Sequence, residues 1–172
     1  MAEQQEKKTF EDYNLPFNLL RGVSANGFES PSPIQEKTIP VLIEGKELIA
    51  QAHSGAGKSL AFIIGSLYHI DANNPNCQSL ILSPTRELAE QTHSVATQVG
   101  QYMKINIHSC IGGTNVGECI NNMKKAQMVI ATPGRLHEML RRNKLNLSKL
   151  KILVIDEPMK CYRRVFLNRL SV

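Results

Sequence analysis

The sequence lacks the features that mark a membrane, disulfide-bonded or zinc-binding protein. Its longest apolar-rich stretch, at about residues 60–70, is too short to span a bilayer, and the polar start has no apolar segment behind it. The four cysteines are scattered, without a C-x-x-C pair or a histidine at zinc-ligand spacing, and we assign none of the five histidines a catalytic role. We therefore expect a cytoplasmic protein, with a nuclear location as the alternative, reduced cysteines and no membrane partner.

The sequence also lacks the length for a two-domain enzyme and, over most of its course, an excess of charge. A chain of 172 residues with 42% hydrophobic content can bury the core of one domain. The net charge is +5, but residues 158–172 hold four basic residues and no acid. The 20 Lys and Arg residues less these four leave 16 against 15 acidic residues in 1–157. The basic composition therefore does not by itself indicate a nucleic-acid partner.

Apolar β-rich runs alternate with helical patterns along the chain. We predict strands at about residues 47–51, 78–83, 105–111, 127–131 and 151–156, and helices at about residues 58–70, 86–103, 115–124 and 134–143. Two helices precede them, from Pro16 to about Ala25 and from Pro33 to Glu44. The alternation predicts an α/β fold with a mainly parallel sheet flanked by helices. Such sheets carry their chemistry on the loops at the carboxyl ends of the strands.

A glycine-rich loop separates the first predicted strand from its helix. It reads Ala52-His53-Ser54-Gly55-Ala56-Gly57-Lys58-Ser59, close to G-x-x-x-x-G-K-[ST] with alanine in place of the first glycine. In such a loop the backbone N–H groups hold phosphate oxygens, while Lys58 would reach the β- and γ-phosphates and Ser59 the Mg²⁺. An ordinary turn before a buried helix is the alternative, and the flanking strand and helix favour a nucleoside triphosphate site.

Two carboxylates, Asp156 and Glu157, follow the last predicted strand. With Lys58 they form the candidate catalytic set. Asp156 would hold Mg²⁺ through water, and Glu157 would orient or deprotonate the water that attacks the γ-phosphate. Two solvated acids in a turn are the alternative, but their position at a strand end downstream of a phosphate loop favours catalysis.

Further motifs make the resemblance specific. The stretch Gly27-Phe28-Glu29-Ser30-Pro31-Ser32-Pro33-Ile34-Gln35, with Phe10 upstream, resembles the glutamine motif of DEAD-box RNA helicases. The resemblance continues in Pro84-Thr85-Arg86-Glu87-Leu88-Ala89-Glu90-Gln91, in Gly112-Gly113 and in Thr132-Pro133-Gly134-Arg135. It is closest to the translation initiation factor 4A-like branch, and it implies the N-terminal RecA-like domain of an ATP-dependent RNA helicase.

The resemblance also implies roles for these residues. Gln35 would pair with adenine and Phe10 would stack on it, which selects ATP over GTP. The sugar-phosphate backbone of RNA would be gripped, without reading of base sequence, by Pro84, Thr85, Arg86, Gly112, Gly113, Thr132, Pro133, Gly134 and Arg135. We expect ATP and Mg²⁺ as cofactors, RNA as the partner, a monomer, and protein cofactors that the sequence does not identify.

The resemblance breaks after Glu157, where the family continues Asp-Glu-Ala-Asp and this chain has Pro158. Restoring one nucleotide after the Glu157 codon permits Ala-Asp-Glu-Met-Leu, so we hypothesise a frameshift. We divide the chain into a flexible tail, residues 1–9, an incomplete ATP-binding domain, residues 10–157, and an aberrant basic tail, residues 158–172, with the second RecA-like domain absent.

This break has an expected structural consequence. By analogy with RecA-like folds, the missing next strand lies between the phosphate-loop strand and the Asp156 strand. Unpaired backbone would flank a gap there unless residues 165–170 fill it, and we expect marginal stability or aggregation.

We therefore distinguish the activity that the family resemblance implies from the activity that we expect of this chain. The family activity is ATP hydrolysis coupled to RNA binding and duplex unwinding. We expect the 172-residue chain itself to be inactive and limited to nucleotide binding and weak RNA binding. The alternative is a non-catalytic nucleotide- or partner-binding fragment. A P-loop small-molecule kinase is disfavoured by Gln35 and by the motif at residues 84–91.

Overall fold

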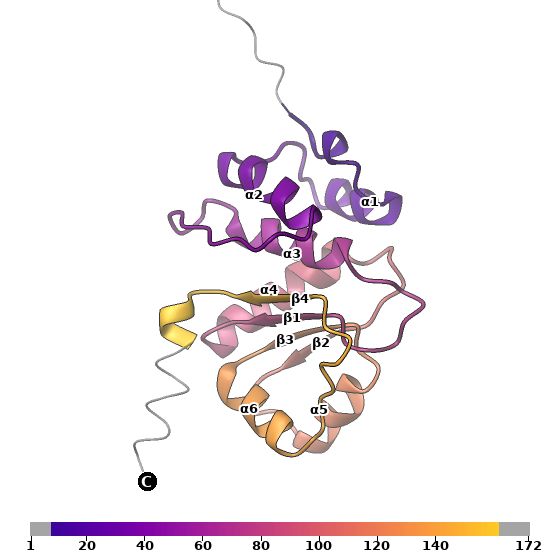
Figure 1. Ribbon diagram of the computed structural model, residues 1–172, viewed down its shortest axis with the longest axis vertical. Coiled ribbons are helices and arrows are strands. Elements are labelled where there is room, and N and C mark those ends of the chain that lie inside the picture. The colour runs from indigo at the N-terminus through magenta and orange to yellow at the C-terminus, as the bar shows by residue number, and fades with distance from the viewer. Residues whose placement is uncertain (1–7, 162–172) are drawn as a thin grey trace, which may run out of the picture.

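A parallel sheet with helices on both faces organises residues 8–161, the part of the chain that this computed structural model describes (Figure 1). Its strands are β1 (Ser79–Leu82), β2 (Ile107–Cys110), β3 (Met128–Ala131) and β4 (Ile152–Ile155). They lie in the order β2-β3-β1-β4, and every neighbouring pair is parallel. The predicted fold class is confirmed, and four of the five predicted strands are present.

The six predicted helices all form, preceded by a short 3-10 helix at Phe10–Tyr13. Their bounds are α1 (Phe17–Ala25), α2 (Pro33–Ile43), α3 (Lys58–Tyr68), α4 (Arg86–Val99), α5 (Val116–Met123) and α6 (Pro133–Arg141). Helices α3 and α4 lie on one face of the sheet with α1 and α2 outside them, and α5 and α6 lie on the other (Figure 1). Helix α4 is shorter than predicted, because Gly100 ends it.

The central strands bury both of their faces, which explains their nearly continuous apolar sequences. In β3, Met128 and Ile130 enter the core beneath α3 and α4, while Val129 and Ala131 enter the core beneath α5 and α6. All four residues of β3 are buried. None of the helices within residues 8–161 is long and apolar enough to cross a membrane.

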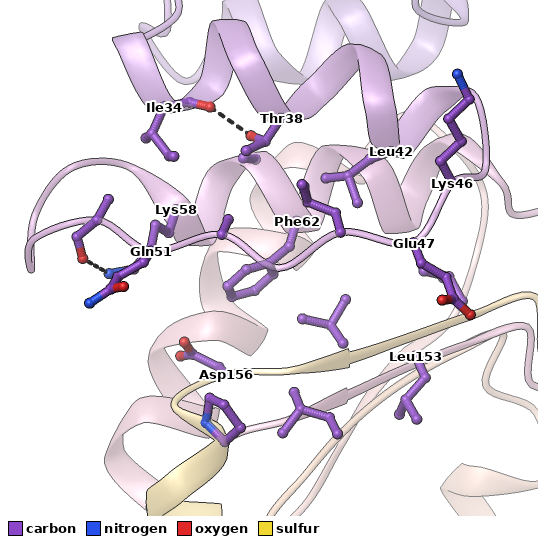
Figure 2. Close-up of a pocket in the computed structure, with 18 of the residues that line it drawn as sticks. Ile34, Thr38, Leu42, Lys46, Glu47, Gln51, Lys58, Phe62, Leu153 and Asp156 are labelled. Atoms are coloured by element: carbon purple, nitrogen blue, oxygen red, sulfur yellow. Dashed lines mark hydrogen bonds between the residues drawn. The ribbon is translucent and has the colours of Figure 1, made fainter.

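The predicted strand at residues 47–51 is absent, so this prediction was wrong. The segment is extended but makes no backbone–backbone hydrogen bond within the described part of the chain, and Ile49 is 100% exposed. An extended segment becomes a strand only by pairing, and no described strand lies beside it. Between residues 46–52 and β4 lies a cavity of about 670 Å³, at the place where the sequence predicts a gap (Figure 2). The predicted tail at residues 1–9 lies mostly outside the described residues, as do residues 165–170.

Candidate functional site

The glycine-rich loop leads directly into the N-terminus of α3. Gly55 and Gly57 have φ angles of +81° and +92°, in the left-handed region that favours glycine. Gly57 is the N-cap of α3, and a Cβ there would lie 2.5 Å from the Gln35 Nε2 and 3.0 Å from the Ser32 Oγ. The loop therefore presents backbone N–H groups at a helix start, an arrangement suited to a phosphate anion.

Two side chains from the start of α2 brace this loop. The Gln35 Nε2 donates to the Gly57 carbonyl at 2.9 Å, and the Ser32 Oγ donates to the Ala56 carbonyl at 2.8 Å. The Gln35 Oε1 in turn accepts from the Ser32 backbone N–H at 2.8 Å, and Gln35 is only 5% exposed. Both ends of the Gln35 amide are thus used within the protein. Its predicted pairing with adenine stays a prediction.

Phe10 lies in the hydrophobic core rather than at an open surface. Its ring is 2% exposed and meets Tyr13 edge to face, with the ring centroids 6.4 Å apart. It belongs to the same cluster as Leu19 and Val23 of α1. In this arrangement Phe10 offers no open ring face, so base stacking by this residue also stays a prediction.

Lys58 and Asp156 lie on opposite sides of the 670 Å³ cavity, which Glu157 also lines (Figure 2). The Lys58 Nζ donates to the carbonyls of Ala52 and His53 and so closes the loop on itself. Burial raises the pKa of the Asp156 carboxyl, the charge of Glu157 adds to this, and the Lys58 ammonium opposes it. Glu157 has a φ of +49° and forms an ion pair with Lys160 at 2.8 Å. The predicted catalytic residues thus share one cavity.

The oxygen atoms available at this site suit a magnesium ion. Ser59 is exposed in the first turn of α3, and Asp156 is half-buried across the cavity. Within residues 8–161 no three His, Cys, Asp or Glu side chains gather in a cluster that could hold a metal. Mg²⁺ in phosphate sites takes one or two protein oxygens and completes its shell with phosphate and water. A hydroxyl and a carboxylate therefore fit this ion.

The predicted RNA-binding loops lie along one edge of the sheet, because they follow β1, β2 and β3, which are neighbours. The exposed Arg86 guanidinium lies against Gly112 and Gly113: a Cβ on Gly113 would overlap its Nη1, and a Cβ on Gly112 would lie 3.3 Å from its Nη2. Thr85 caps α4, since its Oγ1 accepts from the Leu88 N–H at 3.2 Å. Thr85, Arg86, Gly112, Gly113 and Gly134 are at least partly exposed.

The remaining residues of these motifs are buried. Pro84 and Pro133 are buried, Thr132 is 7% exposed and Arg135 is 8% exposed. Arg135 donates to the Thr114 carbonyl at 3.1 Å and to its Oγ1 at 3.3 Å, and pairs with Glu138 at 3.2 Å. It therefore holds the loop after β2 against α6, and RNA contact by Arg135 stays a prediction. Sequence reasoning missed Thr114, although a hydroxyl residue directly after Gly112-Gly113 was a signal for it.

Comparison with known proteins agrees with this geometry. A family model described as DEAD/DEAH box helicase matches residues 32–165. The chain belongs to the DEAD/DEAH box helicase family. An ATP-dependent RNA helicase FAL1 from Scheffersomyces stipitis is 46% identical over 159 residues, which cover 92% of this chain and 40% of the relative. An ATP-dependent RNA helicase eIF4A from Coccidioides immitis is 45% identical over 163 residues, or 94% of this chain and 41% of the relative.

Solved structures of this helicase family match the whole described fold. A DEAD box protein from the hyperthermophile Methanococcus jannaschii superimposes with a TM-score of 0.85 at 32% identity, covering 95% of this chain and 45% of that one. A Dbp5 variant from S. cerevisiae, bound to RNA and ADP BeF3, gives a TM-score of 0.80 at 30% identity, covering 94% and 43%. The predicted RecA-like fold and the 4A-like resemblance are confirmed, and the chain spans about two fifths of the curated relatives it matches.

Proposed function

We propose that this chain is the nucleotide-binding half of an ATP-dependent RNA helicase, in which ATP binding and hydrolysis drive RNA binding and duplex unwinding. The observation that carries the proposal is the shared cavity: Lys58, at the start of α3, lies across it from Asp156, and Glu157, the next residue after β4, also lines it. A cation at a helix N-terminus opposite two carboxylates can hold a triphosphate at one wall and position water at the other.

Each residue has a definite task in this proposal. The N–H groups at residues 55–59 receive phosphate oxygens, and Lys58 exchanges its loop carbonyls for the β- and γ-phosphates. Ser59 and Asp156 hold Mg²⁺, which when bound neutralises charge on these phosphates. Glu157 leaves Lys160 and accepts a proton from the attacking water. Gln35 and Phe10 select adenine in the proposed complex, which requires both to leave the contacts described above.

RNA binds the neighbouring edge in this proposal. The accessible groups there are the Arg86 guanidinium, the Thr85 hydroxyl, and the backbone N–H groups at Gly112, Gly113 and Gly134. These donors suit phosphate oxygens and do not distinguish bases, so binding is independent of sequence and falls with salt. In this proposal a single copy of the chain binds RNA, because all of these donors belong to one chain.

A second candidate is a fragment that binds nucleotide without turning it over. The ion pair between Glu157 and Lys160 favours it, because this carboxylate is engaged by the Lys160 ammonium and must leave it before it can contact an attacking water. In related systems an additional arginine that contacts the γ-phosphate raises the rate of hydrolysis by about 10³–10⁵. A site without this arginine should therefore hydrolyse ATP slowly.

ATP hydrolysis with and without RNA tests both candidates. We would compare the 172-residue chain with a version lengthened by restoring one nucleotide after the Glu157 codon, each with a Glu157→Gln control. RNA-stimulated hydrolysis in the restored version alone, abolished by Glu157→Gln, is the expected result. No hydrolysis in the restored version would refute the helicase proposal. RNA-stimulated hydrolysis by the 172-residue chain would refute its inactivity.

A further inference from the structure

Two cysteine thiols meet between strand β2 and helix α5. Side chains alternate between the two faces of a strand, so His108 and Cys110 share the face of β2 that α5 covers (Figure 1). Cys119 lies on the buried side of α5, and both cysteines belong to the same hydrophobic cluster. The Cys119 thiol donates to the Cys110 Sγ, and the two sulfur atoms are 3.6 Å apart. The thiols are therefore in direct contact.

A base lies beside one of the two thiols. The His108 Nε2 is 3.5 Å from the Cys119 Sγ. Burial lowers the pKa of the His108 imidazole, the charge of His93 lowers it further, and the charge of Glu118 opposes this. The imidazole is therefore neutral near neutral pH. With its ring proton on Nδ1, it can accept the proton of the Cys119 thiol at Nε2.

This base distinguishes Cys119 from the other buried cysteines. Buried thiols are usually inert, because the reactive form is the thiolate. Burial raises the pKa of the Cys77 thiol to about 11, and its Sγ donates to the Ser79 carbonyl at 3.5 Å. Burial also raises the pKa of the Cys110 thiol, and the neighbouring Cys119 adds to this. Cys119 is therefore the thiol suited to react first with an oxidant, and Cys110 is placed to react second.

Strand β2 and helix α5 lie at the margin of the fold, where a small molecule can enter. Within the described sheet β2 is an edge strand. Helix α5 has eight residues, and the exposed Gly117 among them weakens it. Short elements at the edge of a fold open locally more often than central ones. His108 is half-buried and Cys119 is 3% exposed, so local opening of α5 gives an oxidant access to Cys119.

We propose that Cys110 and Cys119 form an intramolecular disulfide when the chain meets a hydroperoxide. The sulfur atoms must approach by about 1.5 Å to reach the bonded distance of about 2.05 Å. The bond closes the loop of residues 111–118, which carries Gly112 and Gly113. The reaction requires neither ATP nor RNA, so the proposal goes beyond the helicase function. Its failure would leave the nucleotide site untouched.

The reaction takes two steps, written here for hydrogen peroxide. The His108 Nε2 accepts the Cys119 proton, and the thiolate attacks one peroxide oxygen as the O–O bond breaks. The leaving hydroxide takes the proton from His108 and becomes water, which leaves Cys119 as a sulfenic acid. The Cys110 sulfur then attacks the Cys119 sulfur, and the hydroxyl group leaves with the Cys110 proton as a second water. Two thiols are oxidised, and one peroxide is reduced to two waters.

Peptide mapping after peroxide treatment tests the proposal with the full chain. The reduced chain is treated with one equivalent of hydrogen peroxide, free thiols are alkylated, and the chain is cut with trypsin. Residues 105–124 contain both cysteines and no Lys or Arg before Lys124, so they form one tryptic peptide. We expect this peptide to lose two hydrogen atoms and to escape alkylation, while Cys77 is alkylated. The chain should remain a monomer on a non-reducing gel, and dithiothreitol should restore both thiols.

Four variants separate the steps. In Cys110→Ala the second step is blocked, so a 1,3-diketone added with urea should trap the sulfenic acid of Cys119. In Cys119→Ala, Cys110 should give no sulfenic acid. His108→Gln should slow disulfide formation at least tenfold, because no base remains beside Cys119. Cys77→Ala is the matched control, since Cys77 is buried but lies before β1, at the opposite end of the sheet from Cys110, and it should leave the rate unchanged.

Several results would overturn the proposal. These are no disulfide in the 105–124 peptide, a disulfide mainly between two chains, and disulfides spread over all four cysteines. Sulfenic acid at Cys110 in Cys119→Ala, formed as fast as at Cys119 in Cys110→Ala, would refute the assigned order. An unchanged rate in His108→Gln would refute the role of His108 as the base. Amide hydrogen exchange of β1 and β3 checks that each variant is folded.

Discussion

Replacement of Gly57 by alanine tests how the phosphate loop is held. The added methyl group would meet the Gln35 Nε2 at 2.5 Å, and the residue has a φ of +92°. Left-handed backbone costs a non-glycine residue about 1–2 kcal/mol. Displacing Gln35 also loses its hydrogen bond to the Gly57 carbonyl, worth about 0.5–1.5 kcal/mol. We expect Gly57→Ala to lower the free energy of unfolding by about 2–3 kcal/mol in urea denaturation.

Gly55→Ala is the matched control. Gly55 has a φ of +81°, but nothing lies within 4 Å of its added Cβ, so only the backbone cost of about 1–2 kcal/mol remains. In a Gln35→Ala background, Gly57→Ala should cost less than it does in wild type, because the closest contact of its Cβ and the lost hydrogen bond both involve Gln35, and only the Ser32 Oγ, at 3.0 Å, then crowds the added Cβ. Equal costs for the two glycine variants in the wild-type background would refute the bracing of the loop by Gln35.

Three further predictions concern other parts of the chain. Arg135→Lys should lower the free energy of unfolding by about 1–3 kcal/mol, because lysine lacks the planar guanidinium and its several donors. The control, Arg86→Lys at an exposed position, should change it by less than about 0.5 kcal/mol. Equal effects of the two variants in urea denaturation would contradict the burial of Arg135. The pKa of the Asp156 carboxyl is raised in the folded state, so stability falls as the pH rises from the ordinary carboxyl range through that pKa. Asp156→Asn should remove this decline and raise the thermal midpoint at pH 7. A pH profile of stability that is the same in this variant and in wild type would count against the raised pKa. Gly22→Ala should destabilise the chain by about 3 kcal/mol or prevent folding, because its Cβ would overlap the backbone carbonyl of Val99, and a thermal midpoint like wild type would exclude this close packing of α1 on α4.

Much of the fold could be predicted from the pattern of apolar residues and from the positions of proline. The buried strands read as short apolar runs, and prolines at the first turns of α2 and α6 mark their starts. Residues 47–51 carry the same apolar signal as the true strands, yet form none. Strand formation depends on a neighbour, and the local sequence of a segment does not report whether that neighbour exists.

Motif matching identified residue types but not what they contact. Gln35 and Arg135 match a helicase pattern, but their polar atoms bond within the protein in this structure. A signal for Gln35 was available, because serine followed three residues later by glutamine is a capping box, and Ser32 and Gln35 form one here. The burial of Phe10 had no such signal, since it results from packing against α1.

Equilibrium binding of a fluorescent ATP analogue to the 172-residue chain, with Mg²⁺, tests the central claim most directly. A hydrogen bond to a charged group is worth about 1.5–3 kcal/mol, so Lys58→Ala should weaken binding by about 10- to 100-fold. Lys46→Ala, at the far end of the same cavity, is the matched control and should leave the affinity unchanged. Saturable binding that depends on Lys58 is the predicted result. Absence of binding, or equal affinity of wild type and Lys58→Ala, would contradict the assignment of residues 52–59 as the phosphate site.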